Sequence, residues 1–343
     1  MKTITKVWML MFAIVLAGGT VSAQKKKKSD APPPPPADAT RFAWEKSKMI
    51  PKLQKLAITE LTVNYKLTTT AKTIAKEDRS GGKIAGARVT GFLEFTDSEP
   101  SQADYQGITD HFYRYFQKKL KENGIDTVGW DQITASEFYQ KSGGEEGDKE
   151  NAQKEGGGNK WVTCTAHKGK VVHKGMAGFA GGKGKRAMYF AKEFGNPVTF
   201  KVNVDFADVM VNMDIKSTDR KDIGGGWYYP ATTSKKYTWG VHAQMMVGDQ
   251  DNTNERTYIW NGKGAAEYLY QWSDIPVEGN YSESVTEDVS KARGGVAKAF
   301  AFRKEFDPVL VQTTREKYIA AATHAVEKWV DAFVARAVQM RKG

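Results

Sequence analysis

The sequence predicts an α+β domain with a mainly antiparallel sheet and helices packed on one face, with an α/β arrangement as the alternative. Within 108–120, apolar residues recur at every fourth position, as in an amphipathic helix. Within 197–215, apolar and polar residues alternate, which is typical of half-buried strands. A second apolar stripe at helical spacing occupies 319–340. Long strands between two strong helices indicate a sheet that is covered on one side.

The first 23 residues have the composition of a secretory signal. Lys2 and Lys6 precede a continuous apolar stretch at 7–17, and Val21-Ser22-Ala23 supplies small residues for cleavage. The apolar stretch is too short to cross a bilayer, although a membrane anchor is the alternative. We therefore expect an exported protein with a mature N-terminus at Gln24, periplasmic or associated with the outer membrane, with an extracellular location as the alternative.

A lysine- and proline-rich linker is predicted at 24–48. Five consecutive prolines at 32–36 favour an extended spacer that buries nothing. The simplest interpretation is a tether between the cleavage site and the domain. The alternative is contact with an anionic surface through Lys25, Lys26, Lys27 and Lys28.

Length, charge and cysteine content limit the domain organisation and the partners that we expect for the rest of the chain. The 343 residues carry a formal net charge of +11 and are 40% hydrophobic, which suits one globular domain at 49–343. Because several of the positive charges lie in the signal and the linker, we expect no nucleic-acid partner. The single cysteine, Cys164, excludes an intramolecular disulfide and lies in an alternating run, so we predict a buried strand residue.

The N-terminal half is predicted to hold two strands, a helix, a short strand and a second helix. Asn123-Gly124 ends the first helix, because glycine tolerates the left-handed conformation found there. Thr134-x-x-Glu137 is a candidate capping box for the second helix. The predicted segments are 56–63, 84–95, 104–123, 125–130 and the helix after Thr134.

Two glycine-rich stretches interrupt the strands. Residues 142–160 are almost free of apolar side chains and are predicted to be a mobile insertion. Residues 173–186 combine glycines with Lys183, Lys185 and Arg186, which are candidates for an anion site lined by backbone N–H groups. The stretch lacks the glycine and hydroxyl positions of a phosphate loop, so a flexible loop is the alternative.

The C-terminal half is predicted as strands followed by a closing helix. The alternation in 197–215 changes phase near Phe206-Ala207, which requires a bulge or a bend. A strand at 237–247 is expected to pair with 256–260 as a hairpin. The closing helix covers 314–340, with Thr313-x-x-Glu316 as its candidate capping box.

No motif in the chain indicates catalysis. The five histidines lack zinc-type spacing, and 249–254 lacks the glycine and glutamate of a calcium loop. We predict no catalytic residue, no metal and no cofactor, and we expect alanine at His111, His242, Asp205, Asp208 or Asp249 to act only through stability. A hydrolase of glycans or peptidoglycan is the rival, since Trp227, Tyr228, Tyr229 and Trp239 could stack on sugars.

Four stretches resemble the curli-secretion lipoprotein family and the related TolB N-terminal-like envelope proteins. These stretches are LAITELTV, FYRYFQKKLKENGIDTVGWDQITASEFY, VHAQMMVGDQDNTNERTYIWNGKG and AVEKWVDAFVARA. The resemblance implies an αβ fold and a non-enzymatic role in binding or oligomeric assembly, for example in secretion or envelope biogenesis, with an envelope protein or a second copy as partner. Members of the secretion type carry a lipidated cysteine, which this chain lacks after its signal.

Overall fold

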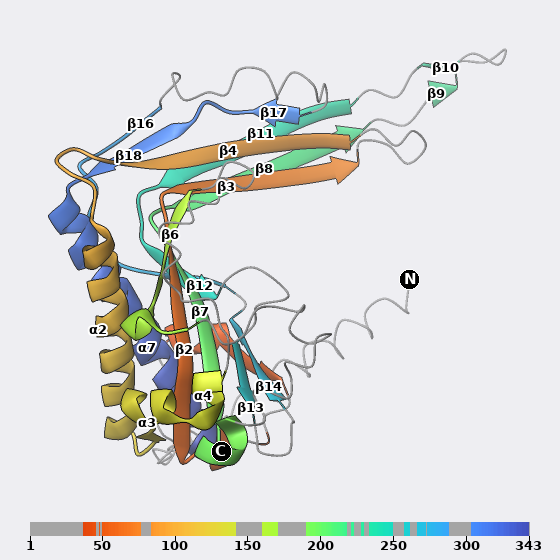
Figure 1. Ribbon diagram of the computed structural model, residues 1–343. Helices are drawn as coiled ribbons and strands as arrows, with labels where there is room; N and C mark the ends of the chain where they lie inside the picture. Colours follow the sequence, from red (N-terminus) through yellow and green to blue (C-terminus); the bar gives the residue numbers. More distant parts are fainter. Residues whose placement is uncertain are drawn as a thin grey trace, which may run out of the picture. The chain divides into compact units, whose positions relative to one another are not determined.

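The computed structural model describes most of the chain after residue 36 (Figure 1). The predicted signal, the lysine–proline tail, residues 142–159 and residues 173–186 lie outside the described residues. The described residues belong to one compact unit that begins at Pro35. They are 37–45, 48, 50–76, 84–141, 160–170, 190–217, 221–222, 228–229, 233–249, 257–260, 266–271, 273–287 and 303–342.

The folded unit begins before the predicted boundary at residue 49. A short 3-10 helix, η1 (Ala37–Arg41), leads into strand β1 (Phe42–Glu45), which pairs with strand β14 (Ala266–Gln271). Phe42 is fully buried and meets Trp329 edge to face, with 5.6 Å between ring centroids. The linker prediction was therefore wrong for these residues, because the aromatic run after the prolines adds a strand to the sheet.

The larger sheet is built around two parallel strands, β2 (Lys55–Lys66) and β7 (Pro197–Asp205). β2 also pairs with β5 and β6, and β7 pairs along its other edge with β12 and β13. The remaining bounds are β5 (Asp126–Thr127), β6 (Trp161–Thr165), β12 (Met246–Asp249), β13 (Thr257–Trp260) and β15 (Ile275–Pro276).

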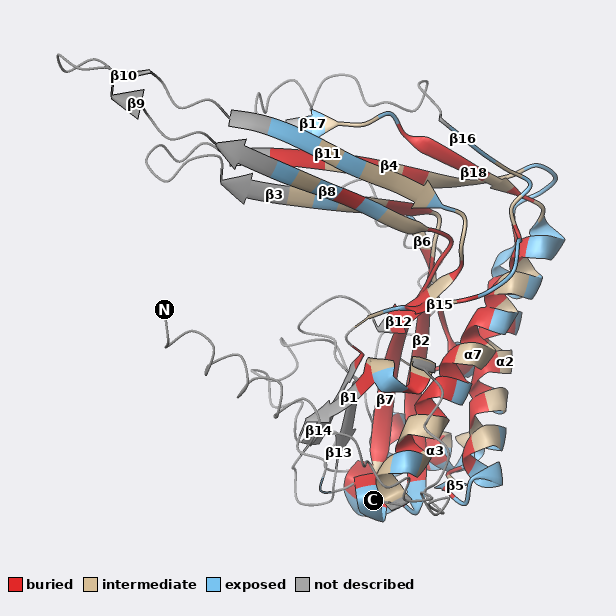
Figure 2. Cartoon of the chain, turned by 180° about the vertical axis from the view of Figure 1, so that it is seen from behind, coloured by how far each residue is buried: buried red, intermediate tan, exposed pale blue. Residues whose placement is uncertain are grey.

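Two long helices cover one face of this sheet, as predicted. α2 (Gln102–Glu122) and α7 (Arg315–Lys342) lie side by side and run in the same direction (Figures 1 and 2). Arg315 contacts the N-terminus of α2, and Arg341 donates to the carbonyl of Asn123 at its C-terminus. Their buried faces pack on β2 and β7 in one aromatic-rich core. The apolar stripes read from the sequence are the faces that this core buries.

The local signals for helix ends were partly right. Gly124 adopts a φ of 69° at the end of α2, as the Asn-Gly pair predicts. The N-cap of α7 is Thr314, whose Oγ1 accepts from the Lys317 N–H, whereas Thr313 donates to the Tyr281 carbonyl. The predicted Thr313 capping box is therefore one residue early, because a tertiary contact occupies that hydroxyl.

The region after α2 also differs from its prediction. Only Asp126–Thr127 forms a strand, and Trp130 begins helix α3 (Trp130–Ala135) rather than ending the strand. The next helix, α4 (Glu137–Lys141), is capped by Ser136, whose Oγ accepts from the Tyr139 N–H. Thr134 lies inside α3 and caps nothing, so the expected Thr134-x-x-Glu137 box was wrong.

A second sheet is centred on β4 (Ile84–Phe95). It holds β3 (Thr68–Lys76), β16 (Ser284–Glu287), β17 (Arg303–Glu305) and β18 (Val309–Thr313). β17 and β18 both run parallel to β4. β4 leads into α2 and β18 leads into α7, so these two strands point the same way as the two parallel helices require. The α+β prediction is confirmed, and the sheets are mixed rather than purely antiparallel.

The predicted phase change marks the passage between layers. β7 ends at Asp205, and strand β8 (Asp208–Ser217) begins after Phe206-Ala207 as half of a hairpin with β11 (Thr233–His242). The predicted strand at 237–247 is divided at 243–245, because the chain returns there to the larger sheet as β12. The expected pairing of this strand with 256–260 was wrong, since β13 pairs with β14 and β7. The two shortest strands are β9 (Lys221–Asp222) and β10 (Tyr228–Tyr229).

Arg315 joins the N-termini of the two long helices. Its guanidinium donates to both oxygens of Asp104, at 2.8 and 3.0 Å, and its backbone N–H donates to Asp97. Asp104 also accepts from Ser101, and these hydrogen bonds, those from Arg315 foremost, lower its pKa to about 2. The Asp97 pKa is lowered mainly by the Arg315 N–H. Both carboxylates therefore bind protons more tightly in the unfolded chain.

We expect this arginine to contribute to acid sensitivity. Because the folded pKa of Asp104 lies below its ordinary value, its contribution to stability is present near neutral pH and is lost as the pH falls from about 4 through about 2. Arg315→Gln should lower stability at pH 7 slightly, since the pair is partly exposed, and the stabilities of variant and parent should converge as the pH falls toward 2. In urea unfolding, the free energy of unfolding of Arg315→Gln should fall less steeply below pH 4 than that of the parent. Lys118→Gln, at another exposed ion pair, should show the same pH dependence as the parent. The parental pH dependence in Arg315→Gln would contradict the assignment.

Candidate assembly surface

The hairpin β8–β11 packs face to face on the second sheet. Val211 of β8 and Val89 of β4 share a small buried core, with half-buried aromatic residues at its edge. Trp239 of β11 stacks on Phe306, with 4.8 Å between centroids and 28° between ring planes. Trp239, which the sequence offered as a sugar platform, therefore has a ring partner between the two layers.

A glycine allows the layers to approach at the centre of β4. A Cβ added at Gly91 would lie 3.4 Å from a methyl carbon of Val241 and 3.6 Å from the Phe206 ring. The hairpin is thus in close contact with β4 at this position, and β8 also lies close to β3, so packing as well as its turn sets the position of β8.

The outer face of the hairpin is polar except at one position. Along β8, Asn212 and Asp214 are exposed on either side of the half-buried Met213, while Val211 is buried in the core shared with β4. Met210 is 40% exposed, one of two large apolar residues so exposed among the described residues. The strand therefore presents one face to the core and the other to solvent.

One edge of β8 pairs with no described strand, although β3 lies close to β8. Among the described strands, β8 and β11 pair only with each other, although β8 is ten residues long. In an antiparallel pair, every second residue turns its N–H and C=O away from the partner strand. Such a row is a template for another strand unless prolines, bulges or charges protect it. β8 contains no proline and no register shift against β11, and its charged residues, Asp208, Asp214 and Lys216, include both signs.

A buried carboxylate holds the corner at which β7 becomes β8. Asp205 is 6% exposed, and its Oδ2 accepts from Lys66 Nζ at 2.8 Å and from Thr69 Oγ1 at 2.9 Å. Its other oxygen accepts from the Ala207 N–H. Lys66 and Thr69 flank the passage from β2 to β3. The Asp205 side chain therefore links the two places where the chain passes between the sheets, from β2 to β3 and from β7 to β8.

A tyrosine supports the same corner from the other side. The buried Tyr281 hydroxyl donates to the carbonyl of Phe206, and burial raises its pKa far above the ordinary value. The Tyr281 carbonyl in turn accepts from Thr313 at the end of β18. The origin of β8 is therefore anchored by side chains from β2, β3 and the segment before β16.

The sequence-predicted site residues are not brought together by the described structure. Lys183, Lys185 and Arg186 lie outside the described residues, as do Lys25, Lys26, Lys27, Lys28 and Trp227. Tyr228 and Tyr229 form the short strand β10, which pairs with β9, whereas Trp239 lies on β11, which pairs with β8.

The histidines and acids named from the sequence are also dispersed. His111 Nε2 lies 2.8 Å from Glu327 Oε1, between α2 and α7. His242 is opposite Asp208 in the hairpin, and Asp249 is opposite Val202 in the larger sheet. Within the described ranges, no three histidine, cysteine, aspartate or glutamate side chains group as a metal site would require.

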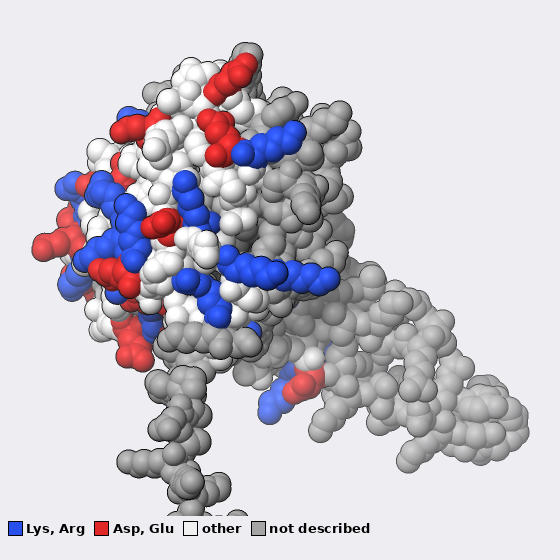
Figure 3. All heavy atoms as spheres, turned by 90° about the horizontal axis from the view of Figure 1, so that it is seen from below, with Lys and Arg blue, Asp and Glu red and all other residues white. Residues whose placement is uncertain are grey.

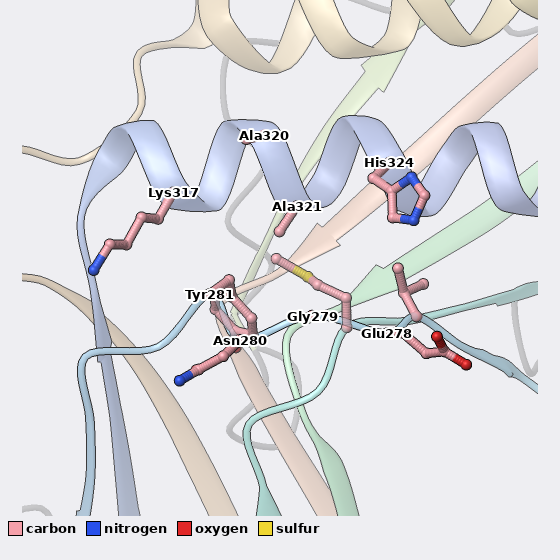
Figure 4. Close-up of a pocket in the computed structure, with 10 residues that line it drawn as sticks. Glu278, Gly279, Asn280, Tyr281, Lys317, Ala320, Ala321 and His324 are labelled. Atoms are coloured by element: carbon pink, nitrogen blue, oxygen red, sulfur yellow. The ribbon is translucent and has the colours of Figure 1, made fainter.

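A small open cavity lies between α7 and the segment at 277–281 (Figure 4). Its volume is about 230 Å3, and Met245, Val277 and Tyr281 form an apolar floor. No sequence pattern predicts this cavity, because a glycine and two alanines line it and none of them belongs to a periodic pattern.

Surface charge on the helix-end face is mixed. Among the described side chains in Figure 3, lysines and arginines alternate with aspartates and glutamates rather than forming a field of one sign. Of the helices in the described ranges, none has the length together with the apolar character that a membrane span needs.

Comparison of the chain with protein-family models, with curated proteins and with solved structures found no match.

Proposed function

We propose that this chain is an exported cell-envelope protein that acts by oligomeric assembly rather than by catalysis, and that copies associate through the edge of β8 opposite β11. The observation that carries the proposal is a ten-residue strand with one edge unpaired among the described strands. Its hairpin is anchored to the rest of the fold by Asp205 and by the core around Val211. A rigidly held edge has less conformational entropy to lose when a second strand pairs with it.

The residue order along β8 suits a second copy of the same strand. Antiparallel pairing about Asn212 would bring position 208 of each copy opposite position 216 of the other. These residues are an aspartate and a lysine, so the pairing would match opposite charges twice, and Met210 would lie opposite Asp214. An interface in which the same patch meets itself is the commonest route to a symmetric dimer.

Pairing would also widen the thinner layer of the fold. The hairpin supplies two strands opposite a sheet of five, and isolated two-stranded sheets are marginal in water. A continuous layer of β11, β8 and the same two strands of a second copy would have four strands. Each cross-strand side-chain pair would contribute about 0.2–1 kcal/mol.

A charge at the centre of the edge should abolish the association. Asn212 is exposed, so Asn212→Lys should fold normally, and it would place two lysines opposite each other. We expect sedimentation equilibrium of the mature chain to show at least a dimer for the parent and a monomer for this variant. Thr238→Lys is the matched control, because Thr238 is exposed and opposite Asn212 on β11 but away from the edge. If the parent is monomeric at high concentration, or if both variants associate like the parent, the proposal is wrong.

The exported location has its own test. Mass spectrometry of the protein purified from the envelope should give a chain that begins at Gln24, since cleavage after Val21-Ser22-Ala23 is expected. Ala23→Arg should block processing, whereas Ala17→Val should leave it unchanged. An envelope form that retains Met1 would contradict the predicted export and cleavage.

A further inference from the structure

The cavity beside α7 has an apolar floor and unequal charges at its two ends. Met245, Val277 and Tyr281 are each less than 5% exposed and form the floor, and Ala321 of α7 covers it from the helix side (Figure 4). Gly279 has a φ of 124°, a conformation that side-chain-bearing residues rarely adopt, and it lets the chain turn around the cavity. The space is large enough for one long side chain.

The charge at one end is already neutralised. Lys317 Nζ lies 3.2 Å from Glu283 Oε1, and hydrogen bonds from Thr96 and from this lysine lower the Glu283 pKa. At the other end, Glu278 is exposed and has no hydrogen bond or ion pair with any described residue. The carboxylate of Glu278 therefore carries a charge that no described residue pairs with, and the exposed His324 of α7 lines the same end of the cavity (Figure 4).

We propose that the cavity is a docking site for a lysine or arginine side chain of a partner protein. The aliphatic stem of such a side chain would lie on Met245 and Val277, under Ala321, and its charged end would reach Glu278. Long basic side chains bury their methylene groups on apolar surfaces while the charged end stays near water or a carboxylate. This site goes beyond strand-edge assembly, and its test does not depend on that proposal.

The test uses the mature chain with labelled methionine and alanine methyl groups. The probes are blocked tripeptides, acetyl-Gly-X-Gly-amide, in which X is arginine, lysine, norleucine or glutamate. Arginine and lysine should shift the Met245 and Ala321 methyl signals in NMR titrations. Norleucine, which keeps the apolar stem without the charge, should bind about fivefold more weakly. Equal binding of all four probes, tighter binding of glutamate, or no shift with any probe would overturn the proposal.

Two variants with matched controls distinguish the contribution of the Glu278 charge to binding from that of the shape of the cavity. Glu278→Gln should remove the preference for arginine over norleucine, while Glu316→Gln, an exposed acid on α7, should preserve it. Ala321→Leu should fill the cavity and abolish the Met245 shift, while Ala103→Leu, at an exposed position of α2, should not. Parental binding by either cavity variant would also overturn the assignment.

Discussion

Trp329→Ala is expected to lower the free energy of unfolding by about 3–5 kcal/mol, the range for removing a large aromatic side chain from a core. Trp329 is fully buried on α7, and its ring lies within 6 Å, centroid to centroid, of rings on β1, α2 and β7. It is therefore the residue through which both helices and the sheet share one core. Its removal would leave a cavity that three elements would have to collapse to fill.

The indole also makes a polar contact that alanine cannot replace. Its Nε1 donates to Gln271 Oε1 at 2.9 Å, and the amide of Gln271 donates to carbonyls of Val247 and Ser273. Trp329→Phe should therefore recover much, but not all, of the loss. Urea unfolding measures both, with Glu316→Ala as an exposed control expected within about 0.5 kcal/mol of the parent. A loss below about 1 kcal/mol in Trp329→Ala would contradict the shared core.

Asp205→Ala should be the second most damaging substitution, with a loss of about 3 kcal/mol. The change removes one acceptor shared by Lys66, Thr69 and the Ala207 N–H in a single step. A partly buried ammonium group without its carboxylate is costly, because burial removes water that would otherwise solvate it.

A double-mutant cycle isolates the ion pair. If Lys66 and Asp205 are coupled as their 2.8 Å contact indicates, Asp205→Ala should cost much less in a Lys66→Met background. Asp307→Ala, at an exposed position between β17 and β18, is the control and should change stability little. Equal losses at positions 205 and 307 would mean that the carboxylate does not hold the corner.

The sequence patterns correctly predicted the elements whose apolar residues repeat at a regular spacing within one short segment. The four-residue spacing in α2 and the phase change at Phe206-Ala207 each record which side of the chain faces the core. β1 was missed because an aromatic run next to prolines has no period of its own. The N-cap of α7 was misplaced because the two adjacent threonines differ only in their tertiary contacts.

Long-range pairing could not be predicted in the same way. Residue alternation in β7 shows two faces, yet nothing in it specifies that β2 is its parallel neighbour or that β12 and β13 share its other edge. The lack of a second partner for β8 among the described strands is likewise a property of the assembled layers. The cavity depends on Gly279 and Ala321, which are far apart in sequence and are each ordinary in their own segments.

Strand-edge assembly is tested most directly by a cysteine at the centre of β8. Pairing about Asn212 would bring this residue opposite its counterpart, within reach of a disulfide. Residue 238 would lie about 14 Å from its counterpart, three strand spacings apart and beyond reach. The native Cys164 is buried and should not interfere. Under mild oxidation of the mature chain, we expect Asn212→Cys to form a covalent dimer and Thr238→Cys to stay monomeric. Equal cross-linking of the two variants, or none in Asn212→Cys, would contradict assembly through this edge.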